Sequence, residues 1–401
     1  MGDTENHGNG VRIGMITPST NTCLEPTTYW LMQGHPEVTT HFARIEVKAI
    51  KLDETSDAQF GLGPMTTAGE QLADAEVDVI AWNGTSGSWL GVEADDAITG
   101  ALSKRFGTPV TTSTKATLEA CRAMGVARLG IVTPYQAEIN ERIGKVYTAR
   151  GIDIIHESHR DLTDNLDFGR VTPEQVADQI RTVAADVDAV AVLCTNVHGA
   201  TVAESLEQEL GVHVLDSVTV TLWECLRLAG YRRPLWGRGA LLRDGFDRLR
   251  MQQICDELIE ATGADRTTLR IDLPGCGLGV DLAAAEATGE SAPPIRREGS
   301  LDQRKLNTVE WLEHNRANLV QPHFTAEPMP PAALIDIYGV RAQMLGPVER
   351  DGKMVGWLSV HSLAERPWTP EDQRALDAAR QQVQDLIDTR SAFRAERPAG
   401  T

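Results

Sequence analysis

The first 240 or so residues of the chain carry one pattern twice. Three segments of a first copy match three segments of a second copy in the same order. RIGMITP at Arg12–Pro18 matches RLGIVTP at Arg128–Pro134, VDVIAWNGTS at Val77–Ser86 matches VDAVAVLCTN at Val187–Asn196, and GTPVTTSTKATLEAC at Gly107–Cys121 matches GVHVLDSVTVTLWEC at Gly211–Cys225. The offsets are 116, 110 and 104 residues, so they drift by only six residues from one match to the next. A duplication of this kind constrains the fold, because both copies have to adopt the same supersecondary structure.

Short β-branched runs alternate with stretches of helical periodicity within each copy. The pattern predicts strands at Arg12–Thr17, Asp78–Trp82, Leu129–Thr133 and Asp188–Leu193, and helices at Thr114–Met124 and Ala203–Leu210. Strands that alternate with helices build βαβ units on a parallel sheet. We therefore expect an α/β domain over residues 11–244. Its two parallel-sheet halves, roughly residues 11–126 and 127–244, would be related by a pseudo-twofold axis with a cleft between them.

Polar residues follow the matched strands at their carboxyl ends, which is where open parallel sheets bind ligands. The candidate binding residues are Ser19, Asn21, Gly84, Thr85, Ser86, Tyr135, Thr195 and Asn196, and the candidate catalytic residue is Cys194. Positions 84 and 194 are equivalent in the repeat, and one is glycine where the other is cysteine. A strand-end cysteine suits proton transfer or nucleophilic attack, although free cysteines also serve as small buried apolar residues. His198 lies four residues after Cys194 and is a further candidate.

The motifs IGMITPSTNT, AWNGTSGS, IVTPYQAEINER, VLCTN, LGVHVLDS and WECLRLAG together resemble the aspartate/glutamate racemase superfamily. Its nearest branches are the arylmalonate decarboxylases and the maleate cis–trans isomerases. The resemblance implies an enzyme that needs no cofactor. It also implies a dioxyanion hole that maps onto Thr85, Ser86 and Tyr135, with backbone donors near Cys194 and Thr195. Racemases and isomerases of the superfamily carry two facing cysteines, whereas a glycine at 84 with a cysteine at 194 resembles the decarboxylase pattern.

Other residues resemble the isomerase branch. The run Pro18–Thr22 is similar to the isomerase sequence, in which the asparagine (here Asn21) helps to hold a carboxylate. Thr195 and Asn196 stand where the decarboxylase has a glycine pair, which narrows the pocket and makes it more polar. Chemistry favours decarboxylation of a malonate-type acid, because one thiol suffices to protonate an enediolate, whereas isomerisation or racemisation requires a second group. A maleate-type isomerase or racemase is the alternative, and a non-catalytic small-molecule sensor is a second one.

The pattern changes after residue 244. We expect a helical linker at 245–266, strands at Leu269–Leu273, Ala333–Tyr338, Ala342–Val348 and Met354–His361, and a closing helix at Thr369–Leu386. The run GPVERDGKMVGWLSVHS followed by WTPED resembles a GAF domain over about residues 267–391. That resemblance implies an α+β domain that binds a small ligand or dimerises through its flanking helices, so a homo-oligomer is expected. Residues 1–10 are predicted to form a disordered tail, and residues 392–401 a second tail.

Charge and cysteine content restrict the partners. The chain has 38 basic and 57 acidic residues, a net charge of −19, which argues against binding nucleic acid or an anionic membrane surface. A small carboxylate substrate remains compatible, because a local field can oppose the net charge. Six scattered cysteines, no signal-peptide pattern and no long apolar run predict a cytoplasmic protein with reduced thiols, no membrane segment and no thiolate metal site. The histidines at 156, 159, 323 and 361 form no evident ligand set, so no metal or other cofactor is expected.

Overall fold

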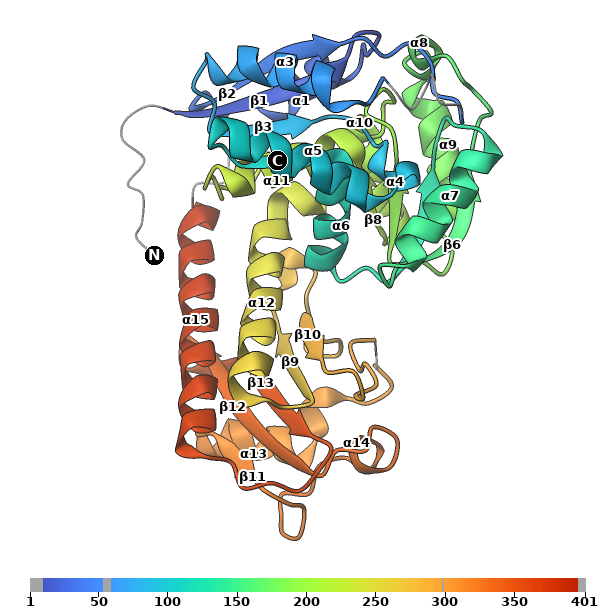
Figure 1. Cartoon of the computed structure of the whole chain (residues 1–401). Helices are drawn as coiled ribbons and strands as arrows, with labels where there is room; N and C mark the ends of the chain where they lie inside the picture. The colour runs from blue at the N-terminus through green and yellow to red at the C-terminus, as the bar shows by residue number, and fades with distance from the viewer. Residues whose placement is uncertain (1–9, 53–58, 298, 396–401) are drawn as a thin grey trace. The chain divides into compact units, whose positions relative to one another are not determined.

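The structure is a computed structural model that describes residues 10–52, 59–297 and 299–395, and it divides into two compact units, residues 1–246 and 247–401 (Figure 1). The division falls inside helix α12 (Ala240–Thr262), which begins five residues before the helical stretch predicted from Gly245. Most of the two predicted tails lies outside the described residues. Residues 392–395 are described, and they extend helix α15 (Pro370–Ala395) rather than forming a tail.

The first unit contains two four-stranded parallel sheets with the same strand order. One sheet runs β2-β1-β3-β4 and the other β6-β5-β7-β8. The strands are β1 (Val11–Pro18), β2 (Val38–Ile45), β3 (Val79–Trp82), β4 (Val110–Thr112), β5 (Arg128–Val132), β6 (Asp153–Ser158), β7 (Ala189–Val192) and β8 (His213–Asp216). The order of the second sheet repeats that of the first strand by strand. The prediction of two parallel-sheet halves is therefore confirmed.

Helices connect the strands in each half. The first half has α1 (Leu24–Leu31), α3 (Leu62–Ala73), α4 (Gly87–Leu90), α5 (Val92–Phe106) and α6 (Ser113–Met124), and the second has α7 (Ala137–Thr148), α8 (Asn165–Phe168), α9 (Pro173–Val183), α10 (Ala200–Leu210) and α11 (Ser217–Leu228). Helices α6 and α11 are equivalent in the repeat and pack against each other between the halves. The Thr221 hydroxyl of α11 donates to Ser113 Oγ of α6 at 2.8 Å.

Sharp strand-to-helix turns place polar groups at the carboxyl edges of both sheets. Thr112 ends β4 and caps α6 by accepting from the Lys115 N–H, and Asp216 ends β8 and caps α11 by accepting from the Val218 and Thr219 N–H groups. These two caps are equivalent in the repeat. A side chain that caps a helix satisfies backbone donors that would otherwise be unpaired. The apolar strands β3 and β7 are fully buried beside these turns, so they fix where the following loops begin.

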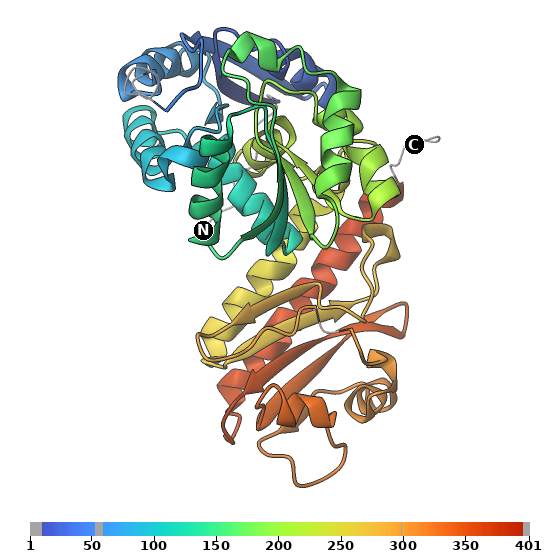
Figure 2. The same ribbon diagram turned by 90° about the vertical axis from the view of Figure 1, so that its right-hand side faces the viewer.

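The second unit is a five-stranded antiparallel sheet in the order β10-β9-β13-β12-β11. Its strands are β9 (Arg266–Ile271), β10 (Ala285–Thr288), β11 (Leu319–Gln321), β12 (Ala342–Arg350) and β13 (Lys353–Ser362). Helices α12 and α15 cover one face (Figure 2), where side chains such as Ile254 and Val383 pack on Leu269 and Leu358. Helix α13 (Asn307–Asn315) lies on the other face, where Val309 packs on Leu345. The predicted α+β architecture is confirmed.

One predicted strand of this unit is wrong. Residues 333–338 begin within a short helix, α14 (Ala332–Asp336), not a strand. The apolar run does not alternate with polar residues, and Pro331 occupies the N-cap position before the good helix formers Ala332 and Ala333. The strand next to β12 is instead β11, a three-residue segment too short to be seen from periodicity. The predicted turn between β12 and β13 is confirmed, with positive φ at Asp351 and Gly352.

Candidate active site

Loops from opposite halves meet beyond the ends of β3 and β7. The Thr195 hydroxyl donates to the Asn83 carbonyl at 3.0 Å, and Asn21 Nδ2 lies 3.2 Å from the Thr195 carbonyl and 3.1 Å from its hydroxyl. All three residues are buried. The two carboxyl edges therefore converge in one place, as expected from the repeat.

A second contact between the halves brings Tyr135 to Thr85. Their hydroxyl oxygens lie 2.8 Å apart, and the Tyr135 ring packs edge-on against Trp89 and Phe168. The Tyr135 hydroxyl also hydrogen-bonds Cys194. A donor from the first half, a tyrosine and the candidate thiol thus form one buried cluster.

Burial controls the charge state of Cys194. The side chain is buried, and its Sγ accepts a hydrogen bond from the Asn196 N–H at 3.3 Å. Desolvation raises the pKa of Cys194 to about 12, against which the hydrogen bonds from Asn196 and Tyr135 act only in part, and the charges of Cys23 and Asp216 raise it further. The thiol therefore carries its proton at neutral pH. It is suited to act as an acid rather than as a standing thiolate nucleophile.

The position opposite Cys194 in the repeat is closed by an indole ring. A Cβ at Gly84 would lie 2.2 Å from Trp82 Cζ2, and the Trp82 Nε1–H donates to Ser86 Oγ at 3.3 Å. In the repeat, Trp82 corresponds to Val192 and Gly84 to Cys194. The first half pairs a large residue with glycine, and the second half pairs a smaller residue with cysteine. A second thiol at position 84 is therefore excluded unless Trp82 moves.

Two predicted binding residues hold the chain at the start of α1. Asn21 Oδ1 accepts from the N–H groups of Cys23 and Leu24, at 3.0 and 2.9 Å, and so satisfies two backbone donors at the start of α1. Asn196 Oδ1 accepts from the N–H groups of Thr22 and Cys23, at 2.9 and 3.2 Å. Both amides have protein partners. Their role in the structure is to join the halves next to Cys194.

Ser19 lies apart from this cluster. Its side chain is exposed, and its hydroxyl accepts from the Val47 N–H at 3.3 Å. The neighbouring Thr20 is connected to the site instead, because its hydroxyl accepts from Asn165 Nδ2 at 2.7 Å while the Asn165 carbonyl accepts from Asn196. Asn165 is buried at the start of α8. Sequence analysis missed Asn165 because it lies outside the segments that repeat.

Cys23 is the second residue that sequence analysis missed. It directly follows the polar run at the end of β1, and its Sγ lies 3.4 Å from His198 Nε2. His198 Nε2 also lies 3.2 Å from the Gly169 carbonyl. The candidate His198 is thus placed beside a thiol of the other half. The available signal for Cys23 was its position two residues after Asn21, at the end of the polar run that follows β1.

The described residues contain neither a cluster of metal-binding side chains nor a helix that could span a membrane. No group of three or more His, Cys, Asp or Glu side chains within residues 10–52, 59–297 and 299–395 is arranged to hold a metal ion. Across the same ranges, every helix is too short or too polar to cross a bilayer. His361 is buried and its Nδ1 accepts from Arg266 Nε at 3.2 Å. Burial and the charges of Arg266 and Arg270 hold the pKa of His361 well below its usual range, so this side chain is neutral.

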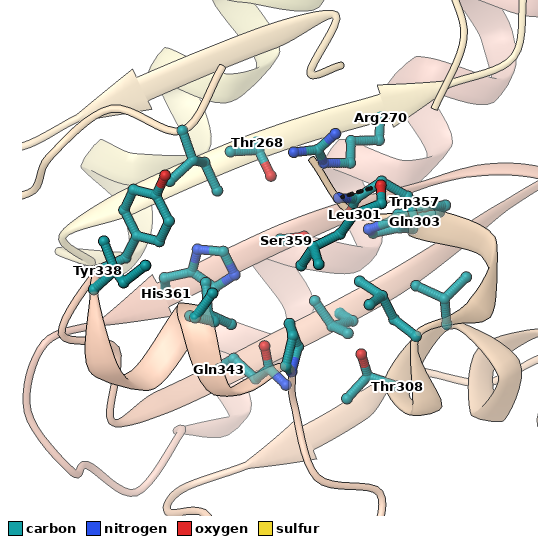
Figure 3. Close-up of a pocket in the computed structure, with 18 of the residues that line it drawn as sticks. Thr268, Arg270, Leu301, Gln303, Thr308, Tyr338, Gln343, Trp357, Ser359 and His361 are labelled. Atoms are coloured by element: carbon teal, nitrogen blue, oxygen red, sulfur yellow. Dashed lines mark hydrogen bonds between the residues drawn. The ribbon is translucent and has the colours of Figure 1, made fainter. Parts of the chain in front are cut away.

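A cavity of about 110 Å³ lies on the sheet face of the second unit opposite α12 and α15 (Figure 3). Side chains from β9, β12 and β13 form its floor, and α13 and α14 flank it. Its polar lining includes Thr268, Thr308, Gln343, Ser359 and His361, and its apolar lining includes Leu301, Val309, Leu334, Ile337 and Trp357. The cavity has the mixed lining typical of a small-molecule site.

A family model described as arylmalonate decarboxylase matches residues 13–242, which is more than half of the chain. The chain belongs to the arylmalonate decarboxylase family. A GAF domain model matches residues 249–385. The resemblances to the racemase superfamily and to GAF domains are both confirmed.

Named members of the family have two activities. A maleate isomerase of Nocardia farcinica is 26% identical over 246 residues, 58% of this chain and 95% of that protein. An arylmalonate decarboxylase of Bordetella bronchiseptica is 28% identical over 205 residues, 47% of this chain and 82% of that protein. A solved structure of the Nocardia farcinica maleate cis–trans isomerase covers 58% of this chain and 98% of its own, with 25% identity and a TM-score of 0.54. These relatives fix the family and leave its two reactions to be distinguished from the site.

Proposed function

We propose that this family member decarboxylates a small malonate-type dicarboxylate without a cofactor. The observation that carries the proposal is the pairing of a protonated Cys194 with a closed glycine position at 84. Loss of CO2 from a malonate leaves an enediolate, which needs one proton to become the product acid. A single neutral thiol supplies that proton.

The remaining carboxylate requires hydrogen-bond donors that stabilise it as negative charge develops. Tyr135 joins the Thr85 hydroxyl to the Cys194 thiol, Ser86 follows Thr85 in the same loop, and all three residues are buried. Donors fixed in a water-excluded site act strongly on a developing enediolate. We assign these three hydroxyls to the carboxylate that stays on the product.

Maleate isomerisation is the alternative, and it makes a different demand on the site. A mutant of the Nocardia farcinica isomerase has been solved with a covalently bound succinylcysteine intermediate, so that enzyme forms a bond between sulfur and substrate carbon. That intermediate is present in a mutant in which one cysteine has been replaced by serine, so another cysteine of that enzyme makes the bond. The repeat position equivalent to Cys194 in this chain is Gly84, which has no thiol, and this supports decarboxylation over isomerisation.

The test is turnover of a panel of 2-aryl and 2-alkyl malonates, followed by CO2 release and by deuterium at the α-carbon when the reaction runs in D2O. We expect Cys194→Ala to lower kcat by roughly 10²–10⁴-fold and to shift Tm by only a few degrees. Cys121→Ala is the matched control, because Cys121 is an equally buried cysteine on α6. Conversion of maleate to fumarate with no CO2 from any malonate would instead establish the isomerase.

We also propose that the second unit binds a small molecule in its 110 Å³ cavity. The neutral His361 and the hydroxyls of Thr268 and Ser359 provide uncharged donors and acceptors beside the apolar wall. A library of small compounds, screened by thermal shift, tests this function. Leu334→Trp should fill the cavity and abolish any shift. A shift that survives in this variant would place the ligand elsewhere.

A further inference from the structure

The proposed reaction consumes one proton in every turnover, and this inference rests on that reaction. The bond between the α-carbon and the leaving carboxylate breaks and CO2 departs. The electron pair of that bond stays on the substrate as the enediolate. The Cys194 S–H proton then forms the new C–H bond and leaves a thiolate. CO2 carries no proton back, so Cys194 has to be reprotonated from solvent before the next cycle.

Solvent has little direct access to that thiolate. Every residue from Ala191 to Ala200 is buried except His198, which is half-buried. On the other side of the thiol, Tyr135 and Thr85 are also buried. A charge on Cys194 is strongly disfavoured there, as the raised pKa indicates. Reprotonation therefore needs groups that can carry a proton through the protein.

Cys23 and His198 are two such groups, and His198 is the half-buried residue of the loop after β7. Cys23 Sγ lies 3.4 Å from His198 Nε2. Cys23 is completely buried, whereas His198 reaches the surface.

Asn196 connects this pair to Cys194. Its backbone N–H donates to Cys194 Sγ at 3.3 Å, and its side-chain carbonyl accepts from the Cys23 N–H at 3.2 Å. One residue thereby holds both cysteines, which come from opposite halves. The two thiols also interact electrostatically, since a charge on Cys23 raises the pKa of Cys194.

We propose that His198 and Cys23 deliver the proton that restores Cys194 after each turnover. His198 takes up a solvent proton at Nδ1 and releases the Nε2 proton to Cys23 Sγ, while the Cys23 S–H proton passes to the Cys194 thiolate past Asn196, the residue that contacts both cysteines. Both thiols end protonated, and His198 returns to its starting tautomer by exchange with solvent. The Gly169 carbonyl, 3.2 Å from Nε2, favours the tautomer that begins the cycle.

Burial keeps both thiols protonated before the reaction. It raises the pKa of Cys23 to about 11 and that of Cys194 to about 12. The thiolate that each turnover leaves on Cys194 is therefore unfavourable and takes up a proton readily. The two positions act through Cys194 and do not touch the substrate, so they are positioning residues for proton delivery.

The first test needs no substrate. The rate at which the Cys194 S–H becomes S–D after dilution into D2O is followed by the infrared S–H stretch, which is assigned by difference with Cys194→Ala. We expect His198→Ala and Cys23→Ala to slow this exchange about tenfold or more. Cys23→Ser keeps a proton-carrying group and should retain most of the rate. His41→Ala is the control, because His41 lies on β2 and its ring nitrogen hydrogen-bonds the Thr39 hydroxyl.

The second test uses turnover of a malonate substrate and rescue by a small proton carrier. We expect kcat of His198→Ala to fall about tenfold or more in dilute buffer and to recover on addition of imidazole, whereas Cys194→Ala should show no recovery. Unchanged S–D exchange in both His198→Ala and Cys23→Ala would overturn the relay. Absence of malonate turnover by the wild-type protein would overturn the proposed function instead, and the exchange rates would still decide whether the relay exists.

Discussion

The complementary sizes of Trp82 and Gly84 predict a specific cost for filling position 84. In Gly84→Cys, the new Cβ would lie 2.2 Å from Trp82 Cζ2, whereas ordinary contacts begin at 3.4 Å. The indole therefore has to retreat by about 1.2 Å (3.4 − 2.2). Trp82 is fully buried, and overpacking of such a core costs about 1–3 kcal/mol. For a unit of this size we expect Tm to fall by about 2–12 °C.

A second substitution separates this steric effect from a general intolerance of cysteine. Trp82→Val with Gly84→Cys copies the pair that the second half carries as Val192 and Cys194. Trp82→Val alone leaves a cavity and should cost about 3–5 kcal/mol. In the double variant the cysteine fills part of that cavity. The combined loss should therefore be smaller than the sum of the two single losses by about 1–3 kcal/mol.

Guanidinium chloride unfolding of the four proteins in the cycle measures this coupling. Gly100→Cys is the control, because a Cβ at Gly100 meets no atom within 4 Å. Additive losses, or a Gly84→Cys variant as stable as the wild type, would refute the reasoning. The double variant also places a second thiol opposite Cys194. It should exchange the α-hydrogen of the product acid in D2O faster than the wild type, and a folded variant without faster exchange would show that the two positions do not share a substrate carbon.

Three other predictions concern pH, domain structure and assembly. Burial raises the pKa of Asp216 from 3.8 to about 7, so the folded state binds more protons than the unfolded state between about pH 4 and 7. The free energy of unfolding should therefore fall as pH rises through that window, by an amount on the order of a few kcal/mol. Asp216→Asn keeps a good N-cap residue and should flatten this part of a Tm-against-pH curve; an unchanged curve would contradict the burial argument. A fragment ending at Phe246 should fold on its own, because its sheets have their own cores, and a non-cooperative melt by circular dichroism would contradict this. We expect the full chain to be a homo-oligomer through its GAF helices, and a monomer mass by light scattering would show that it is not.

The architecture of the first unit could be predicted because duplication supplied two independent copies of each signal. The run before Pro18 and the run before Pro134 are both too short to define a sheet alone. Their match placed β1 and β5 in equivalent positions, and the structure has the same strand order around each. Local pattern was less reliable in the second unit, where α14 was predicted as a strand because its apolar run is short and follows no clear period.

The site was predictable to the extent that it follows the repeat. Thr85, Tyr135, Cys194 and Thr195 follow matched strands, and the structure brings them together. Asn165 comes from a helix with no counterpart in the matched segments, so only the folded chain shows that it reaches the site. Side-chain direction was also beyond the sequence. Ser19 and Thr20 are neighbours of similar chemistry, yet only Thr20 contacts Asn165.

The hydrogen bonds that join the halves have a consequence for dividing the protein. Thr195 reaches the Asn83 carbonyl and Asn196 reaches the Cys23 N–H, so the surroundings of the thiol are supplied by both copies of the module. A chain cut between residues 126 and 127 would yield two fragments, each with a sheet of its own and neither with a complete site. Turnover would resume only when the two fragments associate and complete the site. The family fold is thus suited to split-enzyme complementation, in which the onset of turnover reports that two fused partners have met.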